Sequence, residues 1–108
     1  MKAIAKKVFA TEIESLQHVA GLIDNEFTEI IKAILAGNGK LVIGGVGKSG
    51  IIARKIAATL TSTGTPAFFL HPGEAFHGDM GMVGKQDIAI LISYSGETDE
   101  LLQISTFL

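Results

Sequence analysis

Residues 41–50 read LVIGGVGKSG, an apolar run that ends in glycines and leads into a helix-forming segment. Leu41–Ile43 predict a short buried strand, because strands of a parallel sheet are covered on both faces and read as continuous apolar runs. The next segment, IIARKIAATLTS, has the apolar spacing of a helix from about Ser49 to Ser62. A buried strand that turns directly into a helix is typical of a layered α/β fold.

The same alternation continues along the chain. AFFL at 67–70 and DIAILIS at 87–93 predict two more buried strands, and SGETDELLQISTFL at 95–108 opens a further helix. The polar, glycine-rich stretch 71–87 predicts a loop that could hold one helical turn. We therefore expect parallel strands with helices between them, in a three-layer αβα arrangement.

Two helices are expected before the first strand. Apolar residues recur at three- and four-residue steps over 3–23 and 26–36, and Gly37-Asn38-Gly39 ends the second segment. The prediction is one domain over 1–108, helical in 1–36 and α/β in 40–108, with about three strands. So small a sheet leaves unpaired edges, so we expect either a fragment or a sheet that a partner subunit completes. A naturally short open sheet is the alternative.

Composition excludes several classes of protein. The 108 residues are 47% apolar and 19% charged, with a net charge of −2 and no cysteine. There is no basic stripe for nucleic acid, and no apolar run approaches the ~20 residues of a membrane span. The N-terminus lacks the apolar core of a signal peptide. We expect a cytoplasmic protein without disulfides, and with no nucleic-acid or membrane partner.

The turn Gly44–Gly50 is suited to a phosphate. Glycines let the backbone approach a ligand closely, and free N–H groups at a helix start favour an anion. Lys48 adds a positive charge and Ser49 a hydroxyl. A Walker phosphate loop is not matched, because Val42 stands where its first glycine is required.

Two other interpretations of this turn stay open. Gly45, Gly47 and Gly50 fit the dinucleotide pattern G-x-G-x-x-G, but the acidic residue expected at the end of the next strand is missing. The turn could also be a tight glycine turn with a surface lysine.

A second polar turn follows the third predicted strand. Ser93, Ser95 and Thr98 surround Gly96, and Glu97 and Glu100 follow at a spacing that would share one helix face. An ordinary helix N-cap would explain Ser95 and Glu97, but not Ser93 and Thr98 as well. Because the turns of a parallel sheet emerge at one end, both turns could enclose one phosphate.

The loop HPGEAFHGDMG contains side chains of metal-ligand type: His71, Glu74, His77 and Asp79. Their spacing matches no standard zinc pattern, so we expect no metal and a loop that lines a substrate. His77 is the strongest candidate, since an imidazole could open a sugar ring or hold a hydroxyl. Tying down the loop is the alternative for this histidine.

Three segments together resemble a known family. GVGKSG, STGTPAFFLHPGEAFHGDMGMV and ISYSGETDE are similar to the sugar isomerase (SIS) domain of arabinose 5-phosphate isomerases. The resemblance implies a flavodoxin-like sheet and interconversion of D-arabinose 5-phosphate and D-ribulose 5-phosphate, whose product feeds synthesis of a lipopolysaccharide sugar acid. It also implies a homo-oligomer, typically a tetramer. We expect no cofactor.

The resemblance assigns roles to particular residues. It implies catalytic roles for Lys48 and Glu100, which His77 joins as our candidate. The implied phosphate ligands are Ser49, Ser93, Ser95 and Thr98, and we add Gly47 and Gly96 for their backbone N–H groups. His71, Glu74 and Glu97 are expected to line the substrate.

The family also has features that this sequence does not contain. A further glutamate, a histidine and a pair of CBS modules come later in the family's sequences. A module that senses a sugar phosphate without converting it is therefore an alternative function. The apolar faces of the first and last helices are candidates for subunit contact.

Overall fold

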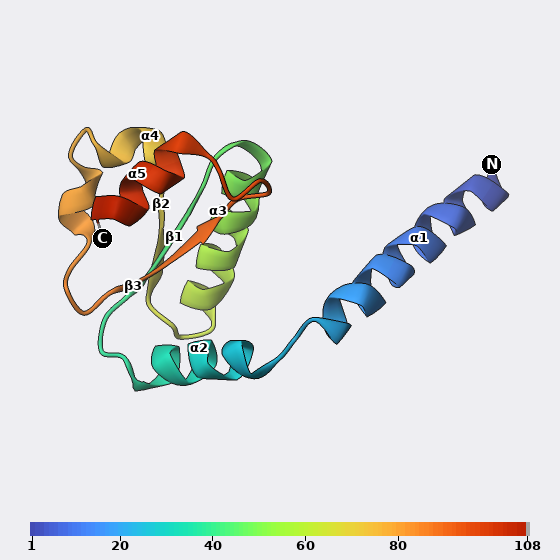
Figure 1. Cartoon of the computed structure of the whole chain (residues 1–108), viewed down its shortest axis with the longest axis horizontal. Helices are drawn as coiled ribbons and strands as arrows, with labels where there is room; N and C mark the ends of the chain where they lie inside the picture. The colour runs from blue at the N-terminus through green and yellow to red at the C-terminus, as the bar shows by residue number, and fades with distance from the viewer. Residues whose placement is uncertain (108) are drawn as a thin grey trace. The chain divides into compact units, whose positions relative to one another are not determined.

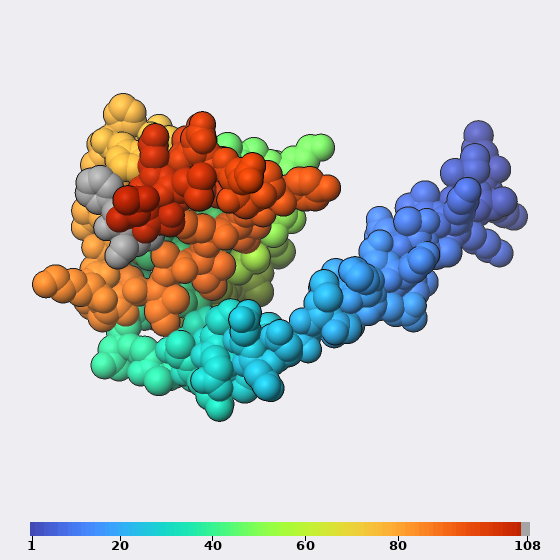
Figure 2. Space-filling model, viewed as in Figure 1, coloured from blue at the N-terminus to red at the C-terminus, as the bar shows by residue number. Residues whose placement is uncertain are grey.

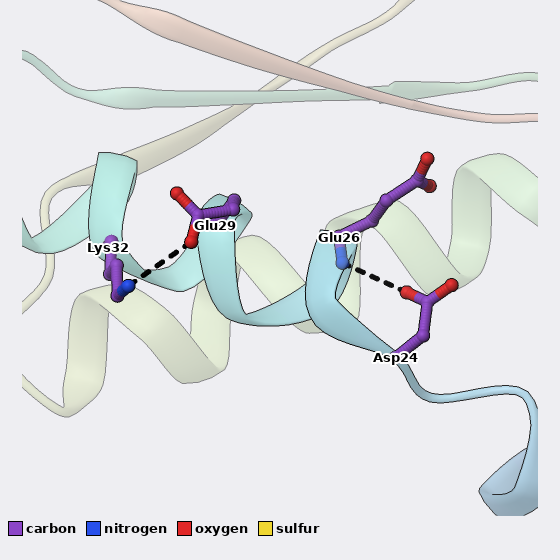
Figure 3. Close-up of polar contacts among 4 residues, drawn as sticks. All are labelled: Asp24, Glu26, Glu29 and Lys32. Carbon is purple, nitrogen blue, oxygen red and sulfur yellow. Dashed lines mark hydrogen bonds and ion pairs between the residues drawn. The ribbon is translucent and has the colours of Figure 1, made fainter.

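The computed structural model describes residues 1–107 and contains two compact units, Met1–Leu35 and Ala36–Leu108. The first unit is helical, with α1 at Lys2–Gly21 and α2 at Asn25–Ala36. Both helices form where the apolar periodicity predicts them. The Asp24 carboxylate accepts a hydrogen bond from the Glu26 N–H at 3.0 Å, which marks the start of α2 (Figure 3).

The helices of the first unit bury none of their residues. Ion pairs on their surface therefore add little to the stability of the fold. One example is the exposed pair between Lys32 and Glu29 at 3.1 Å (Figure 3). Among residues 1–107, no helix has both the length and the apolar character that crossing a bilayer requires.

The second unit is a three-layer αβα sandwich (Figure 1). Its parallel strands are β1 (Leu41–Gly45), β2 (Ala67–Leu70) and β3 (Ile88–Ile92), in the order β2-β1-β3. The helix α3 (Gly47–Ser62) packs on β1 and β2. The short helices α4 (Pro72–Ala75) and η1 (Asp79–Met82) pack together, as do α4 and α5 (Asp99–Phe107).

The core lies on both faces of β1. Val42 and Leu70 are buried against Ala75 of α4 and Ile104 of α5, and partly buried Phe68, Met80, Val83, Ala89 and Leu91 surround them. Leu41 and Ile43 alternate with Val42 and therefore point to the other face, where α3 packs through its buried Ala53 and Ala57. All five residues of β1 are buried, so the expectation of a buried central strand is confirmed.

The element types agree with the sequence, but three boundaries differ. The helix α3 begins at Gly47 rather than Ser49. The strand β3 excludes Asp87 and Ser93, because both side chains bind turn N–H groups instead of continuing the strand. The stretch 71–87 contains both α4 and η1, which is more helix than the single turn allowed for it.

Candidate functional site

The two polar turns leave the sheet side by side. Gly45 at the end of β1 pairs with Ile92 at the end of β3, so the chain leaves adjacent strands at the same edge. Figures 1 and 2 show the start of α3, in green, and the segment after β3, in orange-red, on this rim. After β1 the chain continues to β2, which lies on one side of β1, while β3 lies on the other side of β1. A point where strand order diverges in this way is where open α/β sheets bind ligands.

The first turn presents Lys48 and Ser49 at the start of α3. Val46 precedes the helix with extended backbone, and Gly47 follows with φ of +60°, a conformation that favours glycine. Lys48 is exposed and Ser49 is half-buried. Among the described residues, neither side chain has a hydrogen-bond or ion-pair partner, so both are available to an anion at the helix start.

Close packing brings the start of α3 against β1. A Cβ atom on Gly45 would lie 2.8 Å from the Ser49 carbonyl, and one on Gly50 would lie 2.7 Å from the Gly45 oxygen. The absence of a side chain at these two glycines therefore lets the helix pack directly against the strand. They are two of the three that match the dinucleotide pattern, and their role here needs no dinucleotide.

The second turn is held together by its own hydroxyls. The Ser93 and Thr98 hydroxyl oxygens lie 2.9 Å apart, and Ser93 Oγ also accepts the Gly96 N–H at 3.0 Å. Ser95 Oγ accepts the Glu97 N–H at 3.1 Å, and Gly96 has φ of +72°. These bonds order the turn before α5 begins. Ser95 is therefore not the N-cap of that helix, which was the alternative explanation for it.

The two glutamates near this turn do not share a helix face. Glu97 lies in the turn, whereas Glu100 is the second residue of α5. The expected i,i+3 relation is wrong, because the hydrogen bonds of Ser93 and Ser95 hold residues 93–98 outside the helix. Both carboxylates are exposed, and Glu100 lies in the first turn of the helix that packs against α4.

The loop after β2 carries the remaining candidates. His71 caps α4, and its Nδ1 accepts the Gly73 N–H at 2.9 Å. Glu74 lies within α4 and is exposed. His77 follows the helix and is exposed, and its backbone N–H donates to the Glu74 carbonyl at 3.0 Å. Among residues 1–107 no three acidic or histidine side chains gather closely enough to hold a metal ion.

Sequence reasoning overlooked Asp87. Its two carboxylate oxygens accept the N–H groups of Lys40 at 2.8 Å and Gly84 at 2.7 Å. These hydrogen bonds, first that of Gly84 and then that of Lys40, hold the pKa of Asp87 below its usual value. The only signal in the sequence was an acidic residue between a glycine turn and an apolar strand.

Comparison with protein families identifies the class of domain. The family described as SIS domain matches residues 34–108. The chain therefore belongs to the SIS domain family, as its three motifs predicted.

Several relatives carry a more specific name. The chain is 52% identical over 99 residues to the arabinose 5-phosphate isomerase KdsD of Yersinia pestis, covering 92% of this chain and 30% of the relative. It is 46% identical over 100 residues to the arabinose 5-phosphate isomerase KpsF of Escherichia coli O6:H1, covering 92% and 31%. The chain thus spans about 30% of the length of these relatives.

A solved structure has the same fold. The protein c3406 of E. coli CFT073, determined in complex with A5P, superposes with a TM-score of 0.86 at 52% identity. The match covers 93% of this chain and 53% of that chain. The flavodoxin-like αβα class expected from the sequence is thereby confirmed.

Proposed function

We propose that the full-length protein is an aldose–ketose isomerase that interconverts D-arabinose 5-phosphate and D-ribulose 5-phosphate. The names of its relatives support this substrate, and so does the bound A5P in the similar structure. The product would feed lipopolysaccharide sugar synthesis, and the protein would act in the cytoplasm.

The observation that carries the proposal is the pairing of Gly45 with Ile92. This register brings two turns rich in N–H and hydroxyl groups to one rim of the sheet. The phosphate is proposed to bind there, through the hydroxyls of Ser49, Ser93, Ser95 and Thr98 and the N–H group of Gly47. The Gly96 N–H, which was also expected to bind it, donates to Ser93 Oγ instead and so shapes the turn. Phosphate binding then positions the sugar for reaction.

Isomerisation moves a proton between C2 and C1 of the open-chain sugar through an enediol. Glu100 is the proposed base, because a carboxylate can accept and return that proton. Lys48 is proposed to stabilise the negative charge that develops on the sugar oxygens. His77 is proposed to assist ring opening, with Glu74 and Glu97 lining the sugar.

Conversion of arabinose 5-phosphate by the full-length protein tests this proposal. Glu100→Gln is expected to lower kcat by about 10²–10⁴-fold, the typical contribution of a general base. Lys48→Met should lower kcat by about 10²–10³-fold, as loss of one charge-stabilising donor does. Lys55→Met, which removes an exposed lysine farther along α3, is the matched control and should keep full activity.

The sensing alternative gives a different result in the same experiment. Calorimetry that detects arabinose 5-phosphate binding while no ribulose 5-phosphate forms would contradict the isomerase proposal and favour a regulatory domain.

We also propose that the protein is a homo-oligomer that uses the apolar side chains of its first unit. Large apolar residues of α1 and α2 are more than half exposed, among them Ile4, Val8, Ile13, Leu16, Phe27 and Ile30. An apolar surface of this extent on helices that bury nothing is typical of a contact surface.

A further inference from the structure

We propose that Asn38 is a site of spontaneous chemical modification, where the side-chain amide is lost and isoaspartate forms in the main chain. Asn38 is followed by Gly39. The pair lies shortly after the boundary between the two compact units, Met1–Leu35 and Ala36–Leu108. This inference does not depend on the proposed isomerase activity.

The reaction needs only the chain itself and water. The backbone nitrogen of Gly39 attacks Cγ of Asn38 and forms a C–N bond. The bond from Cγ to the side-chain nitrogen breaks, and ammonia leaves with the proton of the Gly39 N–H. Glycine favours this step because no side chain shields its nitrogen and because its backbone adopts unusual conformations readily.

Water then opens the five-membered succinimide ring at one of its two carbonyl carbons. Opening at the former side-chain carbonyl leaves an aspartate in a normal main chain. Opening at the main-chain carbonyl leaves isoaspartate, in which the main chain runs through the former side chain and is one atom longer. Both products carry a new negative charge at position 38.

The fold leaves both reacting groups free. Asn38 is exposed and Gly39 is half-buried. Within residues 1–107, neither the Asn38 side chain nor the Gly39 N–H takes part in a hydrogen bond. Neither residue belongs to a helix or a strand, so no regular structure has to open before the attack. The reaction is therefore expected in the folded protein.

The other asparagine of these 108 residues is held in the opposite way. Asn25 begins α2, and the nitrogen that would have to attack its side chain belongs to Glu26. The Glu26 N–H donates to the Asp24 carboxylate at 3.0 Å (Figure 3). Asn25 is therefore an internal comparison, in which the attacking nitrogen is occupied and carries a bulkier residue.

The main chain is firmly held just after the reacting pair. The Lys40 N–H donates to the Asp87 carboxylate at 2.8 Å, and the Lys40 carbonyl accepts the Ile88 N–H at 3.0 Å. The Leu41 N–H donates to the Pro66 carbonyl at 2.9 Å. The start of β1 is thus bonded to the starts of both neighbouring strands.

This anchoring decides where the extra main-chain atom goes. Gly39 cannot move toward Gln86, because a Cβ atom at Gly39 would already overlap the Gln86 carbonyl. The added length is therefore expected to displace the chain before Asn38 rather than the sheet. Isoaspartate would lengthen and charge the connection between the two units while β1 stays in place.

Incubation of the full-length protein in mildly alkaline buffer tests the inference, with the same incubation in urea giving the rate of the unfolded chain. Peptide mass spectrometry locates each lost amide. Chromatography, with a protease that cuts before aspartate but not before isoaspartate, distinguishes the two products. Asn38→Gln is the matched variant, because glutamine would have to close a less favourable six-membered ring. Asn38→Asp carries the new charge on an unaltered main chain.

We expect Asn38 to lose its amide at a comparable rate in the folded protein and in urea, with isoaspartate among the products. Asn25 should react roughly 2–10-fold more slowly in the folded protein than in urea, because the hydrogen bond of Glu26 must open first. Asn38→Gln should abolish the reaction at this position. Hydrogen exchange of the Lys40 and Leu41 amides should be as slow in the isoaspartate form as in Asn38→Asp.

Three results would overturn the inference or part of it. An intact Asn38 in the folded protein, under conditions that convert it in urea, would mean that the fold blocks the attack. Aspartate without any isoaspartate would mean that water hydrolyses the amide directly and that Gly39 plays no part. Faster exchange at Lys40 in the isoaspartate form alone would show that the sheet, and not the connection, absorbs the added atom.

Discussion

Gly45 is the residue on which the distance between β1 and α3 depends. Its missing side chain lets the Ser49 carbonyl approach within 2.8 Å of the place where a Cβ would stand. The helix start, with Lys48 and Ser49, is therefore held directly against the end of the strand. The position of these two polar side chains at the rim therefore depends on the lack of a side chain at Gly45.

Gly45→Ala is expected to reduce the free energy of unfolding by roughly 1–3 kcal/mol, the usual range for overpacking a well-packed site. The new methyl group meets backbone atoms, which cannot rotate away as a side chain would. Urea unfolding followed by circular dichroism measures the change.

Gly81→Ala is the matched control, since nothing lies within 4 Å of a Cβ at that glycine. It should keep the wild-type midpoint. An equal loss in both variants would mean that the contact between Gly45 and Ser49 is not the cause.

At this scale the sequence correctly placed the strand, the turn and the helix start that carry Lys48 and Ser49, because these segments follow each other directly. The roles proposed for the two side chains stay predictions. The cap by His71 was not foreseen, because the residues usually preferred at an N-cap are Ser, Thr, Asp and Asn.

At the scale of elements, Asp87 joins the starts of two strands. Its carboxylate binds the Lys40 N–H just before β1 and the Gly84 N–H in the turn before β3. Lys40 also accepts the Ile88 N–H through its carbonyl at 3.0 Å. This end of the sheet is thus fixed opposite the end that carries the polar turns.

The lowered pKa of Asp87 predicts how stability varies with pH. In the unfolded chain the carboxyl group has a pKa of about 3.9, and in the folded chain the two N–H donors lower it. Asp87 therefore stabilises the fold above pH ~4, and the effect is lost as pH falls through the lower, folded-state pKa.

Asp87→Asn should unfold at lower urea concentration than the wild type at pH 6, with the difference narrowing below pH ~4. Asp79→Asn is the control, because Asp79 accepts no side-chain hydrogen bond among the described residues. A gap between wild type and Asp87→Asn that stays constant from pH 6 to pH 3 would contradict the role given to this carboxylate.

Element types were predictable because the apolar periods of strands and helices differ. Element ends were less so, because they depend on hydrogen bonds that side chains make locally. Ser93 and Ser95 delay α5 to Asp99 in this way. The link from Lys40 to Asp87 crosses 47 positions, and no short pattern in the sequence encodes it.

At the scale of the whole molecule, the exposed apolar surface of the first unit is the feature that favours binding to another chain. Ile13 is 53% exposed and Leu16 69% exposed, on a helix that makes no buried contact of its own. The proposed homo-oligomer would remove this surface from water. The sequence indicated the apolar face, but a single chain cannot indicate what covers it.

Ile13→Asp is expected to make the full-length protein form a smaller oligomer, with fewer chains than the wild type. The reason is that a carboxylate placed in an apolar interface loses its hydration without gaining a partner. Size-exclusion chromatography with light scattering measures the mass.

Ser15→Asp is the control on the same helix and should leave the mass unchanged. A wild-type protein that elutes as a monomer at every concentration would contradict the assembly proposal outright.

The order β2-β1-β3 has a consequence for the protein's synthesis. The middle strand is made first, and its second neighbour is completed only at Ile92. A nascent chain that has emerged as far as Leu70 already contains the glycine corner after Gly45, yet lacks the serine corner that lies beside it. On a ribosome, the phosphate site that we propose would thus lack its second turn until Thr98 has left the exit tunnel.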